Sequence, residues 1–371
     1  MKFGIITHAE HKLNGKHIFA YEPYVREMNL WAKHVDEIVV LAPKSIEKEI
    51  LKIETKYKHQ KIEFAEISSF NLKTLKSFII SFFVIPKICF KIFKVMSSVD
   101  HIHLRCPGNI GLLGCLVQIL FPNKTKTVKY AGNWDSKSKQ PLSYKIQKWI
   151  VSNTFLTKNC KVLVYGEWKN QSKNIIPFFT ASYSENEIVD IAPKNLKSKI
   201  KLLFVGNFSA GKQPLLTVKV AEELLKKGYN IQLDMFGNGV KFNSVNDYIL
   251  KNELDKNIIL HGNQSKDIVK KAFQESHFLV FISKSEGWPK VVAEAMFWSC
   301  LPISSKVSCV PFMLGYGERG SVISSNKAEI VLELEKYFTK NNTYAKKVAK
   351  AKGWSQQFTL EKFEDEIKKL L

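Results

Sequence analysis

The sequence predicts an α/β protein made of two Rossmann-like domains that face each other across a cleft. With 371 residues, the chain is too long for one ordinary hydrophobic core. In both halves, short apolar runs bounded by turn residues alternate with helical segments, which is the pattern of parallel strands in βα units. The halves join near "IVDIAPKNLKSK" at 188–199, so a domain boundary is expected there.

The first half contains a series of short strand patterns. The run "KFGIIT" at 2–7 predicts the first strand, and a polar stretch that carries Gly15 follows it. A helix is expected near 19–33. Further strands are predicted at 36–43, 62–67, 100–105, 126–131 and 160–166. Together these segments predict one parallel sheet with helical connections.

The second half repeats this rhythm more regularly. Helices are predicted at 213–228, which ends at the C-cap glycine Gly228, and at 290–300. In open parallel sheets ligands bind beyond the carboxyl ends of the strands, so a site is expected in the loops that follow them. The strands of this half are predicted at 200–206, 230–237, 257–262, 276–283 and 301–305.

The chain is basic, with a formal net charge of +22, and residues 1–200 carry most of the excess. Such a surface suits a polyanionic partner: nucleic acid, an anionic membrane face or a phosphorylated substrate. A lysine-rich proteome is the alternative explanation. Nucleic acid is disfavoured, because the sequence has no zinc-finger spacing, no helix-turn-helix signature and no basic motif interleaved with aromatic residues.

The six cysteines contain no C-x-x-C pair and sit mostly within apolar runs. Buried free thiols in a reducing compartment are therefore expected, and a zinc site is not. The N-terminal "MKFGIITHAEH" has only a short apolar run, so no secretory signal is visible. These observations predict a cytoplasmic protein.

The segment 77–96, "SFIISFFVIPKICFKIFKVM", is strongly apolar but contains several lysines. Its charge-free core is far shorter than the ~20 residues that a spanning helix needs. One interpretation is a buried domain helix, and the other is a basic amphipathic surface that rests on an anionic bilayer. The sequence leaves both open.

Three loops that follow strands of the second half predict a phosphate-binding rim. The first, "NFSAGKQP", ends near Lys212, whose ammonium would neutralise a diphosphate. The second carries Gly237 and Gly239, where the backbone turns tightly or approaches a ligand. The third, "KSEGWPKVVAEA", places Pro289 at the expected first position of a helix, whose free N–H groups would point at the diphosphate.

Two glutamates flank the start of that helix. An acid near a helix N-terminus complements the helix dipole by roughly 0.3–1 kcal/mol, which is the structural explanation. With a diphosphate at the helix end, Glu294 would instead lie about one turn inside the helix and bind ribose hydroxyls. Glu286, in the preceding loop, would then face the transferable sugar. The rim favours this second interpretation.

These residues resemble a known family. The segment 201–323 is similar to the C-terminal domain of the retaining GT-B glycosyltransferases of family 4, also called group 1. The resemblance rests on "FVGNFSAGKQP", on "DMFGNG", and on "FISKSEGWPKVVAEAMFWSCLPISS" with its E-x7-E motif at Glu286 and Glu294. It is looser over 1–200, where "DHIHLRCPGNIG" and "KYAGNWD" lie in the expected loops.

The chain departs from the family pattern at three places. Asn207 stands where the family usually has an arginine, so Lys212 would carry the neutralisation, with Lys290 or Arg105 as helpers. No histidine follows the strand that ends near Tyr130. After "PISSKVS" the chain has "CVPF" instead of the family's paired glycines, which leaves backbone contacts there open.

The resemblance implies transfer of a sugar from a nucleotide diphosphate sugar to an acceptor hydroxyl, with retention of the anomeric configuration. Catalysis would rest on Glu286, which orients the sugar, and on Lys212. Neither a metal nor a cofactor is implied, and the donor would be a UDP-sugar or a GDP-sugar. The other donor-site residues would be Glu294, Gly206, Asn207, Gly237, Asn238, Ser283, Gly287, Pro289, Lys290 and Val291.

The resemblance also divides the chain. Residues 1–193 would bind the acceptor, 194–355 would bind the nucleotide sugar, and the helix at 356–371 would cross back to the first domain. Acceptor or cleft candidates are Gly15, Arg105, Asn109 and Asn133, although Arg105 could equally pair with a surface acid.

A basic first domain suits a lipid-linked acceptor at the inner face of the cytoplasmic membrane, as in capsule, O-antigen (lipopolysaccharide) or exopolysaccharide assembly. The alternatives are a nucleotide-sugar 2-epimerase, a basic non-catalytic membrane or nucleic-acid binding protein, and a storage-glucan phosphorylase or synthase. The oligomeric state stays open.

Overall fold

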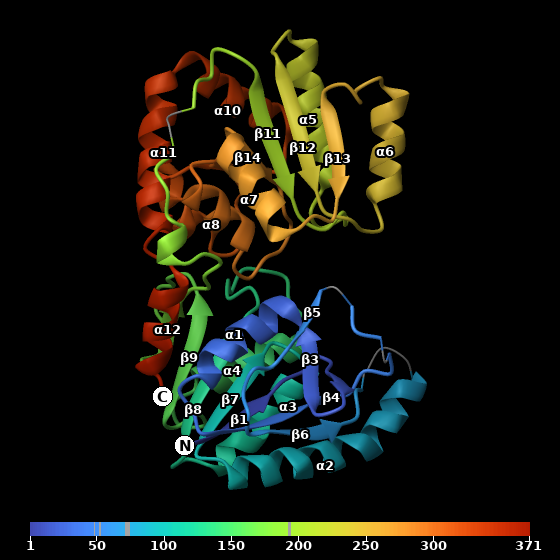
Figure 1. Ribbon diagram of the computed structural model, residues 1–371. Helices are drawn as coiled ribbons and strands as arrows, with labels where there is room; N and C mark the ends of the chain where they lie inside the picture. The colour runs from blue at the N-terminus through green and yellow to red at the C-terminus, as the bar shows by residue number, and fades with distance from the viewer. Residues whose placement is uncertain (48, 52, 71–74, 192–193) are drawn as a thin grey trace. The chain divides into compact units, whose positions relative to one another are not determined.

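The computed structural model describes residues 1–47, 49–51, 53–70, 75–191 and 194–371; the side chains of 75–82 and 341 are outside the description. The chain forms two compact units, Met1–Phe178 together with Phe363–Leu371, and Phe179–Lys362 (Figure 1). The domain boundary expected at 193 falls on residues 192–193, outside the described residues. Each unit has its own parallel sheet.

The first unit is built on a seven-stranded sheet in the order β10-β9-β8-β7-β1-β4-β6. All neighbouring strands are parallel. Six of these strands, all but β10, were predicted, because a strand covered on both faces reads as a continuous apolar run. The strands are β1 (Lys2–Ile6), β4 (Glu37–Pro43), β6 (Ile62–Ile67), β7 (His101–Cys106), β8 (Thr125–Tyr130), β9 (Cys160–Tyr165) and β10 (Ile175–Phe178).

Helices cover both faces of this sheet. Right-handed crossovers place helices on opposite faces when the chain moves in opposite directions along the sheet. From β1 to β4 the chain moves one way, whereas β6 to β7, β7 to β8 and β8 to β9 move the other way. Therefore α1 covers one face, and α2, α3 and α4 cover the other. Their bounds are α1 (Glu22–Ala32), α2 (Leu75–Ser98), α3 (Asn109–Val117) with η1 (Gln118–Leu120), and α4 (Leu142–Ser152).

The helix predicted near 19–33 begins later than expected. Residues 17–21 form β3 (His17–Tyr21), which pairs antiparallel with β2 (Lys12–Asn14) and β5 (Glu54–Lys56) in a small separate sheet. Gly15 opens the two-residue turn between β2 and β3 with φ 57°, as a type II′ hairpin requires. The prediction of helix over 19–21 was wrong, because the hairpin pairs these residues before the helix can start.

The last residues of the chain belong to the first unit. Helix α12 (Leu360–Lys368) places the Phe363 ring 5.4 Å from the ring of Phe178. Glu364 accepts hydrogen bonds from Lys33 Nζ at 2.7 Å and pairs with His34 Nε2 at 2.9 Å. The segment after Lys362 therefore completes the packing of a unit that begins at the N-terminus.

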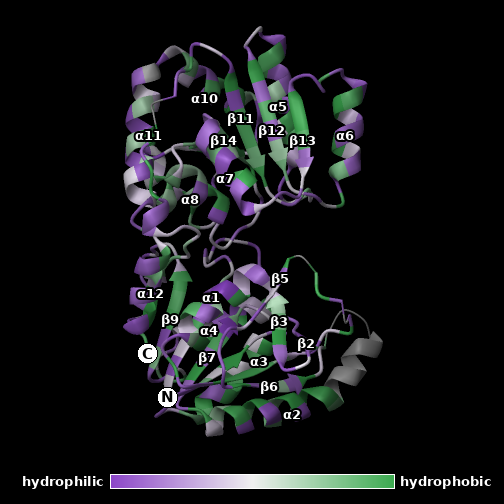
Figure 2. Ribbon diagram, in the orientation of Figure 1, coloured by the Kyte–Doolittle hydropathy of each residue, from purple (hydrophilic) through white to green (hydrophobic). Residues whose placement is uncertain are grey.

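The second unit has a six-stranded parallel sheet in the order β13-β12-β11-β14-β15-β16, which is the strand order of a Rossmann fold. The apolar cores of its strands, including Leu202, Leu233 and Val280, are fully buried. Figure 2 shows hydrophobic residues concentrated in the strands of both sheets. The strands are β11 (Ile200–Val205), β12 (Ile231–Phe236), β13 (Ile258–Gly262), β14 (Phe278–Phe281), β15 (Leu301–Ser305) and β16 (Ser321–Ile323).

Helices of the second unit follow these strands. Gly228, at φ 85°, ends α5, and its N–H donates to Leu225 O at 2.9 Å, which confirms the predicted C-cap. Pro289 is the N-cap of α8 rather than its first helical residue. The helices are α5 (Pro214–Lys226), α6 (Phe242–Lys251), α7 (Lys266–Glu275), α8 (Lys290–Phe297), α9 (Val310–Met313), α10 (Lys327–Thr339) and α11 (Asn341–Ser355), with η2 (Glu185–Glu187) and η3 (Gly315–Gly317).

Candidate functional site

Three loops of the second unit meet where β11, β12 and β14 end, beside the point at which the strand order reverses. The β11 loop and the β12 loop are joined by Phe208 N–H, which donates to Asn238 O at 3.0 Å. The β14 loop joins them through Lys284 N–H, which donates to Gly211 O at 2.9 Å. The predicted rim of three loops is therefore one hydrogen-bonded structure at the place where Rossmann sheets bind ligands.

Close approach of two of these loops depends on glycine. A Cβ built on Gly237, which has φ 125°, would lie 2.0 Å from Gly206 O. A Cβ on Gly239 would lie 2.6 Å from Asn207 Oδ1. Asn207 and Asn238 are themselves exposed on this rim, where a ligand can reach them.

We expect Gly237→Ala to lower the free energy of unfolding by more than about 2 kcal/mol, because it adds a backbone clash to an unfavourable φ. Gly228→Ala is the matched control: its φ of 85° is also unfavourable, but its Cβ would meet no atom within 4 Å. Urea denaturation of the two variants measures the difference. Equal losses would contradict the close contact of the two loops.

A charged cluster lies on this rim. Lys212 Nζ and Ser283 Oγ both donate to Oε1 of Glu286. The Lys212 ammonium also lies 4.7 Å from the centre of the Phe281 ring. The Lys212 side chain remains 26% exposed and that of Glu286 11% exposed, so both can be reached from solvent. The structure thus brings together the two residues to which catalytic roles were assigned.

The loop that carries Glu286 is anchored from behind. Ser283 N–H donates to Ser305 Oγ at 2.9 Å, and Ser305 Oγ donates to Ser283 O at 2.7 Å. Ser308 Oγ and Cys309 Sγ donate to Gly287 O at 2.9 and 3.2 Å. Burial raises the pKa of the Cys309 thiol to about 12, which keeps it a neutral donor. The sequence left the contacts of the segment around 308–310 open. In the structure the side chains of this segment hold the Glu286 loop.

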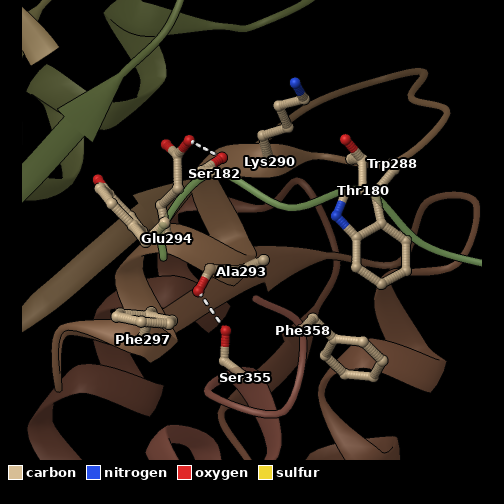
Figure 3. Close-up of a pocket in the computed structure, with 10 residues that line it drawn as sticks. Thr180, Ser182, Trp288, Lys290, Ala293, Glu294, Phe297, Ser355 and Phe358 are labelled. Carbon is tan, nitrogen blue, oxygen red and sulfur yellow. Dashed lines mark hydrogen bonds between the residues drawn. The ribbon is translucent and has the colours of Figure 1, made fainter. Parts of the chain in front are cut away.

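Helix α8 begins directly after this loop. Its N-cap, Pro289, makes no side-chain capping hydrogen bond, so the N–H groups of Lys290 and Val291 in the first turn are not satisfied by a cap. The Lys290 side chain makes no ion pair with any residue that the structure describes, and in Figure 3 it extends away from Phe297 and Ser355. This helix end combines backbone donors with a cation, as an anion site requires.

Glu294 lies one turn further along α8, in a different environment from Glu286. Its Oε1 accepts a hydrogen bond from Ser182 Oγ at 2.6 Å, which Figure 3 shows as a dashed line. Burial, and next the Glu294 carboxylate, raise the pKa of the adjacent Tyr183. No hydrogen bond among the described residues links Glu294 to the Lys212–Glu286 cluster.

A small pocket surrounds Glu294 (Figure 3). The pocket has room for about one water molecule, whose centre can move within ≈ 10 Å³. It is therefore too small to enclose a nucleotide. No motif pointed to Ser182 or Thr180, because they lie in irregular chain more than 100 residues before α8. The pocket is lined by Thr180, Ser182, Tyr183, Trp288, Lys290, Ala293, Glu294, Phe297, Ser355 and Phe358.

The acceptor candidates of the first unit share no hydrogen bond with one another among the described residues. Gly15 lies in the hairpin turn described above. Asn109 Nδ2 donates to Phe70 O at 3.3 Å, and Asn133 Oδ1 accepts from Asp135 N–H at 2.9 Å.

Arg105 is buried rather than exposed. Its Nη1 donates to Glu27 Oε1 at 2.5 Å, with side-chain exposures of 10% and 9%, and its guanidinium lies 5.2 Å from the centre of the Tyr24 ring. Burial lowers the pKa of Arg105, but the negative charge of Glu27 raises it. With the other nearby groups, the pKa of Arg105 lies above its ordinary value. The sequence left two partners open for Arg105, a surface acid or the substrate, and its partner in the structure is a buried acid on α1.

Residues 186–354 match the family model described as glycosyl transferases group 1. Over its full length the chain is similar in fold to Anabaena Alr3699/HepE, solved with UDP and glucose, at 11% identity and TM-score 0.69, with 98% of that chain covered. It is also similar to the apo form of the lipopolysaccharide outer core galactosyltransferase WaaB, at 16% identity and TM-score 0.66, covering 100% of this chain and 99% of that chain.

TarM is similar to part of the chain, at 16% identity and TM-score 0.58, over 76% of this chain. The chain spans 58% of the length of TarM. At these identities the likeness establishes the shared fold. A comparison with curated proteins gave no significant match.

Proposed function

We propose that this chain, whose residues 186–354 match the family model of glycosyl transferases group 1, is a retaining enzyme that transfers a sugar from a nucleotide diphosphate sugar to an acceptor hydroxyl. The observation that carries the proposal is the Lys212–Glu286–Ser283 cluster beside the uncapped start of α8. A cation, backbone donors and a carboxylate are there held on one rim of a Rossmann sheet.

The main chemical task is to stabilise charge on the departing diphosphate. Lys212 supplies a partly exposed ammonium, and the first turn of α8 supplies backbone N–H groups. Donors fixed before the reaction stabilise developing charge without reorganising, which makes such terms large. Lys290 adds a second cation at the helix end and takes the place of the arginine that Asn207 replaces.

In the proposed reaction the bond between the anomeric carbon and the diphosphate oxygen breaks while the acceptor oxygen bonds to the same face of that carbon. The proton of the acceptor hydroxyl passes to the departing diphosphate oxygen, so no enzyme nucleophile is needed. Glu286, paired with Lys212, accepts a hydrogen bond from a sugar hydroxyl, which orients the sugar for this attack.

Glu294 is proposed to hold the ribose. Only its Oε1 is bonded among the described residues, to Ser182, so Oε2 can accept from a ribose hydroxyl. Because the HepE structure holds UDP and glucose, a UDP-sugar is the first donor to test, with a GDP-sugar next.

The proposed acceptor is a lipid-linked saccharide at the inner face of the cytoplasmic membrane, as in assembly of a capsule, O-antigen or exopolysaccharide. The basic first half of the chain supports this proposal, because its positive charge would attract an anionic membrane surface that holds the acceptor. Within the part of the chain that the structure describes, no helix combines the length and the apolar character needed to cross a bilayer.

A thermal-shift panel of UDP-, GDP-, ADP- and CDP-linked sugars tests the donor site. A ligand at 100 times its Kd is expected to stabilise the protein by about 2.7 kcal/mol. The matching donor should shift the melting temperature of the wild type but not that of Lys212→Met. If no nucleotide sugar shifts the wild type, the donor site and the proposed function are wrong.

A further inference from the structure

Helices α2, α3 and α4 form one layer over a single face of the first unit's sheet. Their crossovers all run in the same direction, and α3 packs against both α2 and α4. The side of this layer that faces away from the sheet is called here the α2–α4 face. It has no further helix or strand of the first unit packed on it among the described elements.

The α2–α4 face collects exposed apolar side chains. Every phenylalanine and tryptophan that is exposed among the described side chains lies on α2, on α4 or, as Phe155, three residues beyond the end of α4. Folding alone does not explain this, because large exposed apolar patches usually mark an interaction site. Its exposed apolar residues are Phe83, Phe90, Phe93, Leu116, Leu120, Leu142, Ile146, Trp149 and Phe155, with exposures from 38% to 77%.

Helix α2 carries two different faces. Ile88, Ile92, Val95 and Met96 recur at helical spacing and are buried against the sheet. On the opposite side, Phe83, Phe90 and Phe93 alternate with the exposed Lys87, Lys91 and Lys94. Figure 2 shows hydrophobic and hydrophilic residues alternating along this helix. The buried side fits the first interpretation that the sequence left open, and the exposed side has the basic and apolar residues that the second one requires.

Helix α4 repeats the arrangement. Leu142, Ile146 and Trp149 are exposed at spacings of four and three residues, with the exposed Lys145 among them. Beyond the helix, the exposed Lys158 ammonium lies 5.1 Å from the centre of the Phe155 ring. Aromatic rings and lysines therefore lie together on two helices of the face.

The charge of the α2–α4 face has one sign. The sequences of α2, α3 and α4 contain no aspartate or glutamate. Lys87, Lys94 and Lys145 make no ion pair with a described residue. Lysines of the second unit, in contrast, often pair with acids, such as Lys227 with Glu335 and Lys327 with Glu223. A lysine-rich composition alone does not explain this difference.

We propose that the α2–α4 face docks on an anionic lipid bilayer, with its aromatic rings at the boundary of headgroups and acyl chains and its lysines on the lipid phosphates. Apolar rings surrounded by unpaired lysines match both parts of that boundary. A second copy of the chain fits less well, because a two-fold contact would place lysines against lysines. The inference refines the membrane setting of the proposed function by naming the surface.

Vesicle co-sedimentation of the full chain tests this surface. Wild type should bind phosphatidylcholine vesicles with 30% phosphatidylglycerol and bind pure phosphatidylcholine weakly. Lys87→Gln/Lys94→Gln/Lys145→Gln should weaken binding to the anionic vesicles about 100-fold, since each surface lysine contributes about fivefold. Phe90→Ser/Trp149→Ser should weaken it at least tenfold.

Matched variants of the second unit serve as controls. Lys241→Gln/Lys251→Gln/Lys256→Gln removes the same charge from exposed positions, and Val240→Ser/Leu250→Ser removes exposed apolar side chains. Both should bind vesicles like wild type, and all variants should melt like wild type. Equal weakening by the controls would overturn the proposal. So would a wild-type dimer, seen by light scattering, that the face variants dissociate while vesicle binding persists.

The vesicle experiment is independent of sugar transfer. If vesicles bind through this face but no nucleotide sugar shifts the melting temperature, the docking inference stands and the proposed function fails. If face variants lose vesicle binding but keep the nucleotide shift, the docking inference and the donor site of the proposed function both hold.

Discussion

Glu286→Gln is expected to lower kcat for sugar transfer by about 10²–10³-fold, with a free energy of unfolding close to that of wild type. Glutamine keeps the shape of the side chain and can still accept from Ser283 Oγ. It removes the charge that holds the Lys212 ammonium and weakens any hydrogen bond to the sugar. Single-turnover kinetics with the donor identified by the thermal-shift panel measures the loss.

Comparison with Lys212→Met separates the two roles of Glu286. If Glu286 acts only by positioning Lys212, adding Glu286→Gln to Lys212→Met changes nothing further. We expect a further loss, because the carboxylate is also proposed to contact the sugar. Glu275→Gln is the control, since Glu275 pairs with Lys201 at 2.9 Å on the surface of the same unit. Full activity of Glu286→Gln would exclude a catalytic role for this acid.

Glu27→Ala is expected to lower the free energy of unfolding by about 3–5 kcal/mol, because it leaves the Arg105 guanidinium buried without its counter-charge. Arg105 is nearly enclosed and stacks on Tyr24, so it cannot simply turn into solvent. Glu27→Leu/Arg105→Met, which removes both charges, should lose much less. Urea denaturation followed by circular dichroism measures all three proteins.

Helix α1 itself supplies the control for this prediction. Arg26 pairs with Glu22 at 2.6 Å, but the two side chains are 58% and 36% exposed. Glu22→Ala should therefore lower the free energy of unfolding by less than about 1 kcal/mol. A loss at Glu27 no larger than that at Glu22 would show that the buried pair adds nothing to stability.

The parallel sheets could be predicted because their buried strands are continuous apolar runs. The strands that were missed have reasons of their own. In β2 and β5 polar residues predominate, and both are only three residues long. Strand β10 contains Pro177 and lies at the edge of its sheet, where a missing donor is tolerated. Short or edge strands depend on tertiary pairing that no local pattern records.

The site could be predicted only in part. Motif spacing placed Lys212 and Glu286 near one ligand, and the structure joins them directly. Spacing could not show that Ser182 would bond to Glu294, because 112 residues separate them. Nor could it show that Arg105 would be bonded to Glu27, 78 residues away. Such partners are brought together by the order in which the strands and helices pack, and a single sequence does not show this order.

The return of the chain to its first unit at Phe363 sets the order in which the two units can be completed during translation. The second unit is one continuous segment, Phe179–Lys362, and can fold as soon as it has left the ribosome. The first unit is completed only when Phe363, which contacts Phe178, and Glu364, which bonds Lys33 and His34, have been synthesised. A nascent chain stalled before Phe363 therefore presents a finished second unit beside an unfinished first one.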